Sequence, residues 1–297
     1  MSQNVASRPT SPYNTWFLLS ERKRNDVLKL WEVQQYGSDS FGDPNYISIY
    51  GMLPRQWYRQ GVRLLGRTAV ECTRDRLANQ IGGDVASVAK RAGCTRGSVV
   101  VDPCAGSCNT LFWIQRHLAA ERAIGFEIDD DVFAATRKNL FVCGLDVELF
   151  HERHETGLPR LRLQKDQLLA VFISPPWGRT VSRASGLDLR RTTPPVSDIV
   201  DLVSKLFLRN KLLFAVELLE AFDQGSVAEV TKRFDWSKLR IYDIDVAGRN
   251  HGILLGTRNW MPSDDVVLSD TVASQCVPAP SSECLPAHVL SHGPGSA

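Results

Sequence analysis

Short apolar runs alternate with amphipathic segments from residue 98 to residue 256, and this alternation constrains the fold more than any other feature. A buried run, a helix and then another buried run are typical of parallel strands joined by crossover helices. The first run, SVVVD (Ser98–Asp102), is β-branched and lacks the polar alternation of a half-exposed strand. The sequence therefore predicts an α/β, doubly wound, Rossmann-like fold.

Seven strands are expected in this region. They are predicted at 98–102, 122–128, 147–150, 168–173, 212–216, 238–246 and 251–256. Helices are predicted at 75–92, 111–118, 131–143, 198–207 and 227–234, and Gly144 is the expected C-cap of the third. The last two strands are joined by the turn Gly248-Arg249-Asn250, so we expect a terminal antiparallel hairpin at the edge of the sheet.

The remaining segments differ in composition. Residues 1–12 and the tail 261–297 are predicted to be disordered, because the tail is rich in Pro, Ser and Gly and poor in aromatic residues. Residues 13–72 are predicted to be a helical, aromatic N-terminal extension, and residues 73–260 the α/β domain. No run approaches the ~18 apolar residues of a membrane helix, and the start does not resemble a signal peptide.

Charge and cysteine content narrow the class of partner. The net charge is only +2, but Lys and Arg outnumber Asp and Glu nine to three between Leu53 and Arg96. Such a segment suits contact with a polyanion such as nucleic acid, although spaced arginines also form ordinary solvated helix faces. The seven cysteines include no CxxC pair, so we expect neither a metal site nor a disulfide framework.

Two motifs point to a nucleoside cofactor. The first strand enters the loop Asp102-Pro103-Cys104-Ala105-Gly106-Ser107-Cys108-Asn109-Thr110, where a single glycine disfavours a dinucleotide fingerprint. The second strand ends at Glu127, which suits hydrogen bonds to two ribose hydroxyls. Asp129 or Asp130 is better explained as the N-cap of the following helix.

The most specific motif is Ser174-Pro175-Pro176-Trp177-Gly178, directly after the fourth strand. An exocyclic amine can donate to the Ser174 side chain and the Pro175 carbonyl while Trp177 stacks on the base. These acceptors orient the nitrogen toward an electrophile, and the sulfonium methyl of S-adenosylmethionine is such an electrophile. Glu217 and Glu220, after the fifth strand, fit a solvated role and a functional role equally well. The histidines His117, His151, His154 and His251 are interpreted as surface or loop residues.

These motifs resemble those of the class I S-adenosylmethionine-dependent methyltransferases, and among them the trimethylguanosine synthases, which methylate N2 of RNA cap guanine. The segment Leu30–Tyr36 and the helix from Thr73 are also similar to that family's extension. The resemblance implies the seven-stranded methyltransferase sheet and a monomer acting on capped small nuclear or nucleolar RNA in the nucleus, without membrane contact.

The resemblance also implies residue roles. Asp102, Gly106, Asn109, Thr110 and Glu127 would hold the cofactor, and Glu152 is the expected acidic residue near the adenine. Ser174, Pro175 and Trp177 would be the catalytic corner, with Trp177 on the 7-methylguanine and Arg55 and Arg59 on the RNA.

Cys108 replaces a glycine of the family loop, and DPCAGSCNT also resembles the DPFAGSGTT loop of amino-group DNA methyltransferases. Methylation of adenine N6 or cytosine N4 is therefore an alternative, and an inactive nucleic-acid-binding module is a second one.

Overall fold

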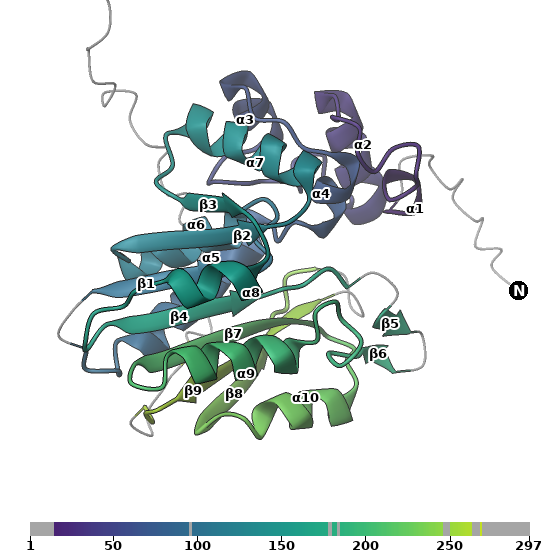
Figure 1. Cartoon of the computed structure of the whole chain (residues 1–297). Helices are drawn as coiled ribbons and strands as arrows, with labels where there is room; N and C mark the ends of the chain where they lie inside the picture. Colours follow the sequence, from purple (N-terminus) through teal and green to yellow (C-terminus); the bar gives the residue numbers. More distant parts are fainter. Residues whose placement is uncertain are drawn as a thin grey trace, which may run out of the picture.

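One mixed sheet with the strand order β3-β2-β1-β4-β7-β9-β8 forms the centre of the molecule (Figure 1). The computed structural model describes residues 15–94, 97–177, 180–182, 185–245, 250–262 and 268. The strands are β1 (Ser98–Asp102), β2 (Arg122–Glu127), β3 (Glu148–His151), β4 (Leu168–Ile173), β7 (Lys211–Leu219), β8 (Trp236–Ile241) and β9 (His251–Arg258). Parallel pairing joins β3, β2, β1, β4 and β7, while β9 is antiparallel to both of its neighbours.

This strand order is that of the class I methyltransferase sheet, so the predicted fold and its terminal hairpin are confirmed. The helices cover both faces, as the doubly wound prediction requires. One face packs against α5 (Asp75–Ala89), α6 (Asn109–Leu118) and α7 (Asp130–Cys143). The other packs against α8 (His154–Gly157), the 3₁₀ turn η1 (Leu158–Arg160), α9 (Val196–Leu206) and α10 (Gln224–Thr231).

The wholly apolar sequence of β4 follows from its place between these two layers. Leu168, Ala170 and Phe172 pack into the core on the α5 side. Their neighbours Leu169, Val171 and Ile173 pack into the core on the α9 side. A central parallel strand has no solvated face, so both sets of alternating side chains are apolar.

The N-terminal extension is helical, as predicted. Its helices are α1 (Thr15–Leu18), α2 (Leu30–Phe41), α3 (Pro54–Gln60) and α4 (Gly66–Glu71), and Figure 1 shows them beside α7 at the β3 end of the sheet. Trp57 is fully buried, and its indole N–H donates to the Ile47 carbonyl at 3.0 Å. Most aromatic residues here therefore serve packing, although Trp31 is half exposed.

Several boundaries differ from the prediction. β7 continues to Leu219 instead of ending at Val216, and β8 ends at Ile241 instead of Val246. The small hairpin of β5 (Val181–Ser182) and β6 (Gly186–Leu187) was not expected, because two-residue strands leave no periodic signal. The Gly144 C-cap is confirmed by its left-handed conformation.

The chain ends were predicted to be disordered. Those segments lie outside the described residues except for Met261, Pro262 and Leu268, of which Leu268 is buried in the α5-side core. Most of the predicted turn at 248–250 also lies outside them. Among the described residues, no helix combines the length and apolar character needed to cross a membrane.

Candidate active site at the carboxyl edge of the sheet

The loop after β1 makes a tight turn at the carboxyl edge of the sheet. Asp102 ends the strand, and its Oδ1 accepts the Cys104 N–H at 2.9 Å. Gly106 (φ +49°) and Cys108 (φ +57°) both adopt the left-handed conformation that favours glycine. The Cys108 thiol is fully buried beside Gly125 of β2, and burial raises its pKa well above the usual value. The cysteine therefore lies on the β2 side of the loop.

Glu127 connects the end of β2 to this loop. Its Oε2 accepts the Gly106 N–H at 3.0 Å, and its Oε1 accepts the Asp129 N–H at 2.9 Å. Burial raises the pKa of Glu127, while these two N–H donors oppose that shift. Asp129 is the N-cap of α7, accepting from the main-chain N–H groups of Asp131 and Val132, as predicted.

Asn109 and Thr110 open α6 and are both buried. The Asn109 side-chain oxygen accepts the Tyr50 N–H at 2.7 Å, and its amide nitrogen donates to the Thr73 carbonyl at 2.8 Å. Asn109 therefore fastens the loop to the N-terminal extension. Its assigned contact with a cofactor stays a prediction.

Asp102 is held in an environment that disfavours its charge. It is 3% exposed, and burial raises its pKa to about 7, with the charges of Glu127 and Glu217 adding to the effect. The main-chain donor at Cys104 opposes that shift. The carboxyl group therefore titrates near neutral pH.

The Ser174–Trp177 corner follows β4 at the same edge. Pro175 is buried, Pro176 is exposed, and the Ser174 and Trp177 side chains are half-buried. The Trp177 ring lies 5.5 Å from the His251 ring, tilted by 37°. Its indole Nε1 is buried and has no hydrogen-bond partner among the described residues. Gly178 lies outside them.

A buried acid lies beside this corner, and sequence reasoning left its role undecided. Glu217 is 2% exposed near the end of β7. Its Oε2 accepts the Thr73 hydroxyl at 2.8 Å, and its Oε1 lies 3.0 Å from Nδ1 of His251. Burial opposes its ionisation, but His251, Thr73 and Ser174 outweigh burial and hold the pKa of Glu217 below its usual value. The signal was a lone carboxylate between Val216 and Leu218, inside an apolar run.

The other predicted residues lie further from this corner. Glu152 follows β3 and pairs with Arg160. Arg55 and Arg59 are exposed on α3, and the end of that helix contacts α7 through Gln60, whose amide donates to the Val142 carbonyl at 3.3 Å. RNA contact by these arginines stays a prediction.

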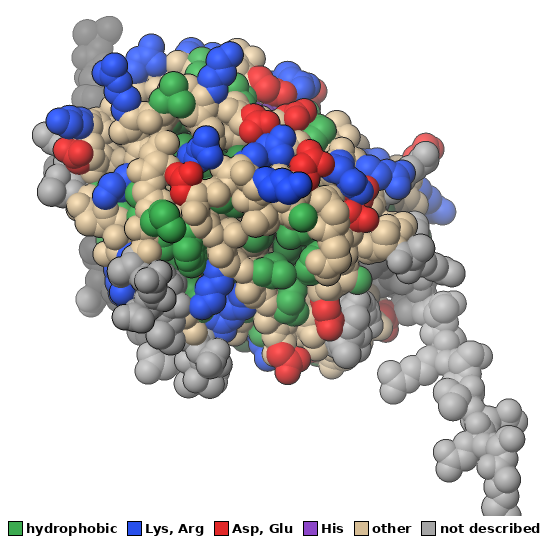
Figure 2. Space-filling model, turned by 90° about the horizontal axis from the view of Figure 1, so that it is seen from below, with side chains coloured by type: hydrophobic (Ala, Val, Ile, Leu, Met, Phe, Trp, Pro, Cys, Tyr) green, Lys and Arg blue, Asp and Glu red, His purple; other side chains and the backbone are tan. Residues whose placement is uncertain are grey.

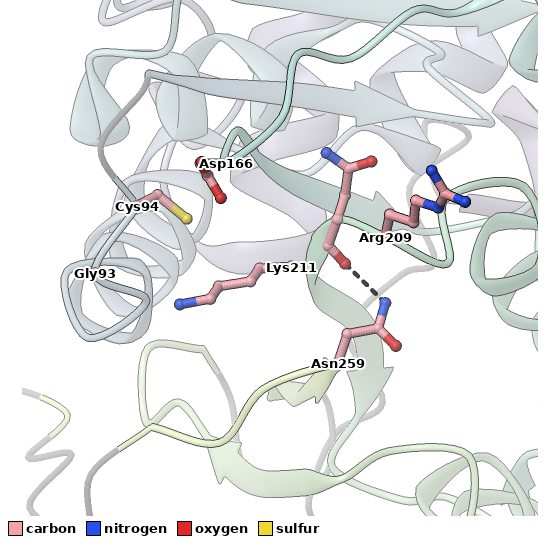
Figure 3. Close-up of a pocket in the computed structure, with 7 residues that line it drawn as sticks. Gly93, Cys94, Asp166, Arg209, Lys211 and Asn259 are labelled. Carbon is pink, nitrogen blue, oxygen red and sulfur yellow. Dashed lines mark hydrogen bonds between the residues drawn. The ribbon is translucent and has the colours of Figure 1, made fainter.

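A cavity of about 340 Å³ lies at the opposite edge of the sheet. Its lining includes Lys211, which begins β7, and Asn259, which follows β9 (Figure 3). Ligands of doubly wound sheets bind at the carboxyl ends of the strands, so this cavity is separate from the candidate site. On the face seen in Figure 2, basic and acidic side chains are interspersed. No metal-binding group of three or more His, Cys, Asp or Glu side chains occurs within the ranges described.

The strand order and the loop–carboxylate pair at its edge define a protein with the class I methyltransferase fold. No family model and no curated protein matches the sequence. Similar solved structures include an rRNA methylase from Streptococcus thermophilus, at 16% identity over 62% of this chain and 98% of that one, with a TM-score of 0.38.

Another is the human methyltransferase 10 domain containing protein, at 13% identity over 62% of this chain and 84% of that one, with a TM-score of 0.45. A putative methyltransferase from Streptococcus mutans in complex with SAH is 13% identical over 60% of this chain and 95% of that one, with a TM-score of 0.37. Likenesses at this level do not assign a reaction or a substrate to this chain.

Proposed function

We propose that the chain is an S-adenosylmethionine-dependent methyltransferase that acts on the exocyclic N2 amine of a 7-methylguanosine RNA cap. One observation carries the proposal: the three predicted motifs end adjacent strands at one edge of the sheet. Glu127 ends β2, the loop from Asp102 follows β1 and Ser174 follows β4, and these strands are neighbours in the order β2-β1-β4. A cofactor over the first two motifs would therefore lie next to a substrate at the third.

The loop and Glu127 fit a nucleoside cofactor. Each Glu127 oxygen accepts one main-chain N–H, and the remaining lone pairs can accept ribose hydroxyls. A Cβ at Gly106 would meet no atom closer than 4.0 Å, so the main chain is open to a ligand on that side. When bound, S-adenosylmethionine supplies a methyl group on a positively charged sulfur, which an amine nitrogen can attack without a strong base.

The Ser174–Trp177 corner would hold the acceptor base. The Ser174 oxygen and the Pro175 carbonyl would each accept one N–H of the amine, which directs the nitrogen lone pair toward the methyl group. The nitrogen would take the methyl group as the carbon–sulfur bond breaks, and the amine proton would then leave to solvent. The Trp177 indole would stack on the base, where a cationic 7-methylguanine adds ~1–2 kcal/mol over plain guanine.

The proposal implies capped small nuclear or nucleolar RNA as the substrate, with the nucleus as the compartment. Arg55 and Arg59 would then contact phosphates, which makes the affinity for RNA salt-dependent.

Methylation of adenine N6 or cytosine N4 is the second candidate. The two acceptors at Ser174 and Pro175 recognise an amine, and they do not distinguish the ring that carries it. The loop sequence DPCAGSCNT, which resembles that of amino-group DNA methyltransferases, favours this candidate.

Mass spectrometry after incubation with labelled cofactor separates the candidates. We expect a 7-methylguanosine cap analogue to gain methyl, while unmethylated GTP and adenine or cytosine oligonucleotides stay unchanged. Methylation of an oligonucleotide instead would support the second candidate. Calorimetry that detects no S-adenosylmethionine binding would support an inactive binding module.

Replacing Trp177 tests the stacking role. Trp177→Ala should lower kcat/KM for the cap analogue by at least about tenfold, because the stacking and cation–π contributions are lost. Trp31→Ala is the matched control, since Trp31 is half exposed on α2. A Trp177→Ala protein that methylates the cap at the wild-type rate would exclude this assignment.

A further inference from the structure

Ser174 and Glu217 are neighbours across the sheet. β4 and β7 are parallel, and Ile173 of β4 is in register with Val216 of β7. Ser174 directly follows Ile173 at the end of β4, and Glu217 directly follows Val216 on β7. The predicted amine acceptor and the buried acid therefore come next after the last paired residues of the two strands. The local apolar pattern of β7 does not account for a carboxylate at this position.

The hydrogen bonds to Glu217 fix which partner donates. An ionised carboxylate only accepts, so the proton between Glu217 and His251 is on Nδ1 of the imidazole. Thr73 donates to the other oxygen at 2.8 Å. Ser174 follows the strand paired with β7, and its hydroxyl is one of the groups that favour the ionised form of Glu217. Thr73 and His251 therefore act as donors, and a Ser174 hydroxyl directed at the same carboxylate can only donate to it.

The direction of the Ser174 hydrogen bond determines whether its hydroxyl donates to a ligand or accepts from it. A serine hydroxyl has one proton, and when that proton is directed at Glu217 only the oxygen lone pairs remain. We propose that Glu217 is a positioning residue that makes Ser174 an obligatory hydrogen-bond acceptor, so that the corner selects an exocyclic amine and disfavours a keto oxygen. The inference rests on the proposed methyl transfer to an amine, but not on the identity of the ring.

The selectivity arises from unpaired acceptors. A base that presents a carbonyl to the Ser174 oxygen and the Pro175 carbonyl leaves three oxygens without a donor, whereas an amine supplies two N–H groups. Sites built to bind a particular donor discriminate strongly against analogues that lack it. Without Glu217, the Ser174 hydroxyl can rotate and donate, and this discrimination weakens.

Glu217→Gln and Glu217→Asp separate the positioning role from packing. Gln preserves the shape of the side chain but adds an N–H donor, whereas Asp keeps an acceptor-only carboxylate on a shorter side chain. We expect Glu217→Gln to lower kcat about 10- to 100-fold while the Kd for S-adenosylmethionine changes less than twofold. Glu217→Asp should retain more activity than Glu217→Gln. If Glu217 only packs, Glu217→Gln should retain more activity than Glu217→Asp, because Gln preserves the shape. Glu220→Gln, at the exposed end of the same segment, is the control.

A double-mutant cycle tests whether Glu217 acts through Ser174. In a Ser174→Ala background, adding Glu217→Gln should change kcat less than threefold, because the hydroxyl it orients is gone. Binding of the 7-methylated nucleotides of guanine and hypoxanthine, which differ by the N2 amine, gives a second measurement. The wild type should prefer the guanine ligand at least tenfold, and Glu217→Asp should keep more of that preference than Glu217→Gln.

The outcomes distinguish this inference from the proposed function. Additive effects in the cycle, or a Glu217→Gln protein as active as the Glu220→Gln control, would overturn the positioning role and leave the cap activity in place. If the wild type methylates adenine or cytosine instead, the cap assignment fails, and the same cycle is measured on that acceptor. A wild type that methylates none of these amines overturns both. Should Glu217→Gln not fold, Glu217→Asp with the two-ligand comparison decides alone.

Discussion

Asp102 shows how a single residue can couple stability to the candidate site. Its pKa is about 7 in the folded chain, where burial and the nearby charges of Glu127 and Glu217 disfavour ionisation. The ordinary value is near 4. Between these values the folded chain keeps a proton that the unfolded chain has lost. The free energy of unfolding therefore falls as the pH rises through this window.

Asp102→Asn should remove that dependence. The amide keeps an oxygen that can accept the Cys104 N–H, but it does not ionise. We expect the variant to gain stability relative to wild type as the pH rises from 4.5 to 7.5, by a few kcal/mol at most, since one pKa unit corresponds to about 1.4 kcal/mol. Urea unfolding at a series of pH values measures this difference. If the free energy of unfolding has the same pH dependence in Asp102→Asn and in wild type, the raised pKa of Asp102 is contradicted.

At the scale of elements, β2 and the loop after β1 can pack closely together because Gly125 has no side chain. A Cβ there would lie 2.8 Å from the Ala105 Cβ and 3.4 Å from the Cys108 Sγ. The strand therefore approaches the loop closely, and this approach brings Glu127 within hydrogen-bonding distance of Gly106.

Gly125→Ala should push β2 and the loop apart. We expect a loss of about 1–3 kcal/mol in the free energy of unfolding, together with weaker binding of S-adenosylmethionine. Gly83→Ala in α5 is the control, because its Cβ would meet no atom closer than 3.9 Å. That change should stabilise the helix by up to about 1 kcal/mol. Chemical denaturation gives the free energy of unfolding, and calorimetry gives the affinity for S-adenosylmethionine. If Gly125→Ala and Gly83→Ala have the same stability and the same affinity, the close approach of β2 and the loop is contradicted.

At the scale of the whole molecule, ion pairs and hydrogen bonds at the carboxyl edge join the N-terminal extension to the α/β domain. Arg67 of α4 pairs with Asp129 after β2. The Tyr46 hydroxyl of the extension donates to Asp245, and Arg74, at the start of α5, pairs with the same carboxylate at 2.9 Å. The Arg74 guanidinium also lies 4.3 Å from the centre of the Tyr46 ring.

Arg74→Met should destabilise the chain, because it leaves the Asp245 carboxylate buried without its counter-charge. The side chains of this pair are only 8% and 3% exposed. Breaking a buried pair costs about 3–5 kcal/mol, whereas removing both charges often costs little. Addition of Asp245→Asn to Arg74→Met should therefore restore much of the stability in thermal or urea unfolding.

Arg233→Met is the control, because it breaks the more exposed pair with Asp201 and should cost less than about 1 kcal/mol. Similar losses for both arginine variants would contradict this account.

The amino-acid sequence by itself determined the seven strands of the main sheet and the chain positions of the motifs. β1 and β4 occur where their apolar runs predict them, and Glu127 and Ser174 lie at or directly after the ends of strands. These features are local, because burial on both faces and helix capping leave signals within a few residues. The helical extension was also predictable, but its contacts with the domain were not.

Only the tertiary structure decided the insertion of β9 between β7 and β8 and the contacts of Glu217. Thr73 and Glu217 are 144 positions apart in the sequence, and His251 is a further 34 positions away. Which residues meet across a sheet depends on strand order and register, and a strand's own pattern specifies neither its partner nor its offset. For the same reason the apolar run around Glu217 marked an unusual carboxylate but did not identify its partners, Thr73 and His251.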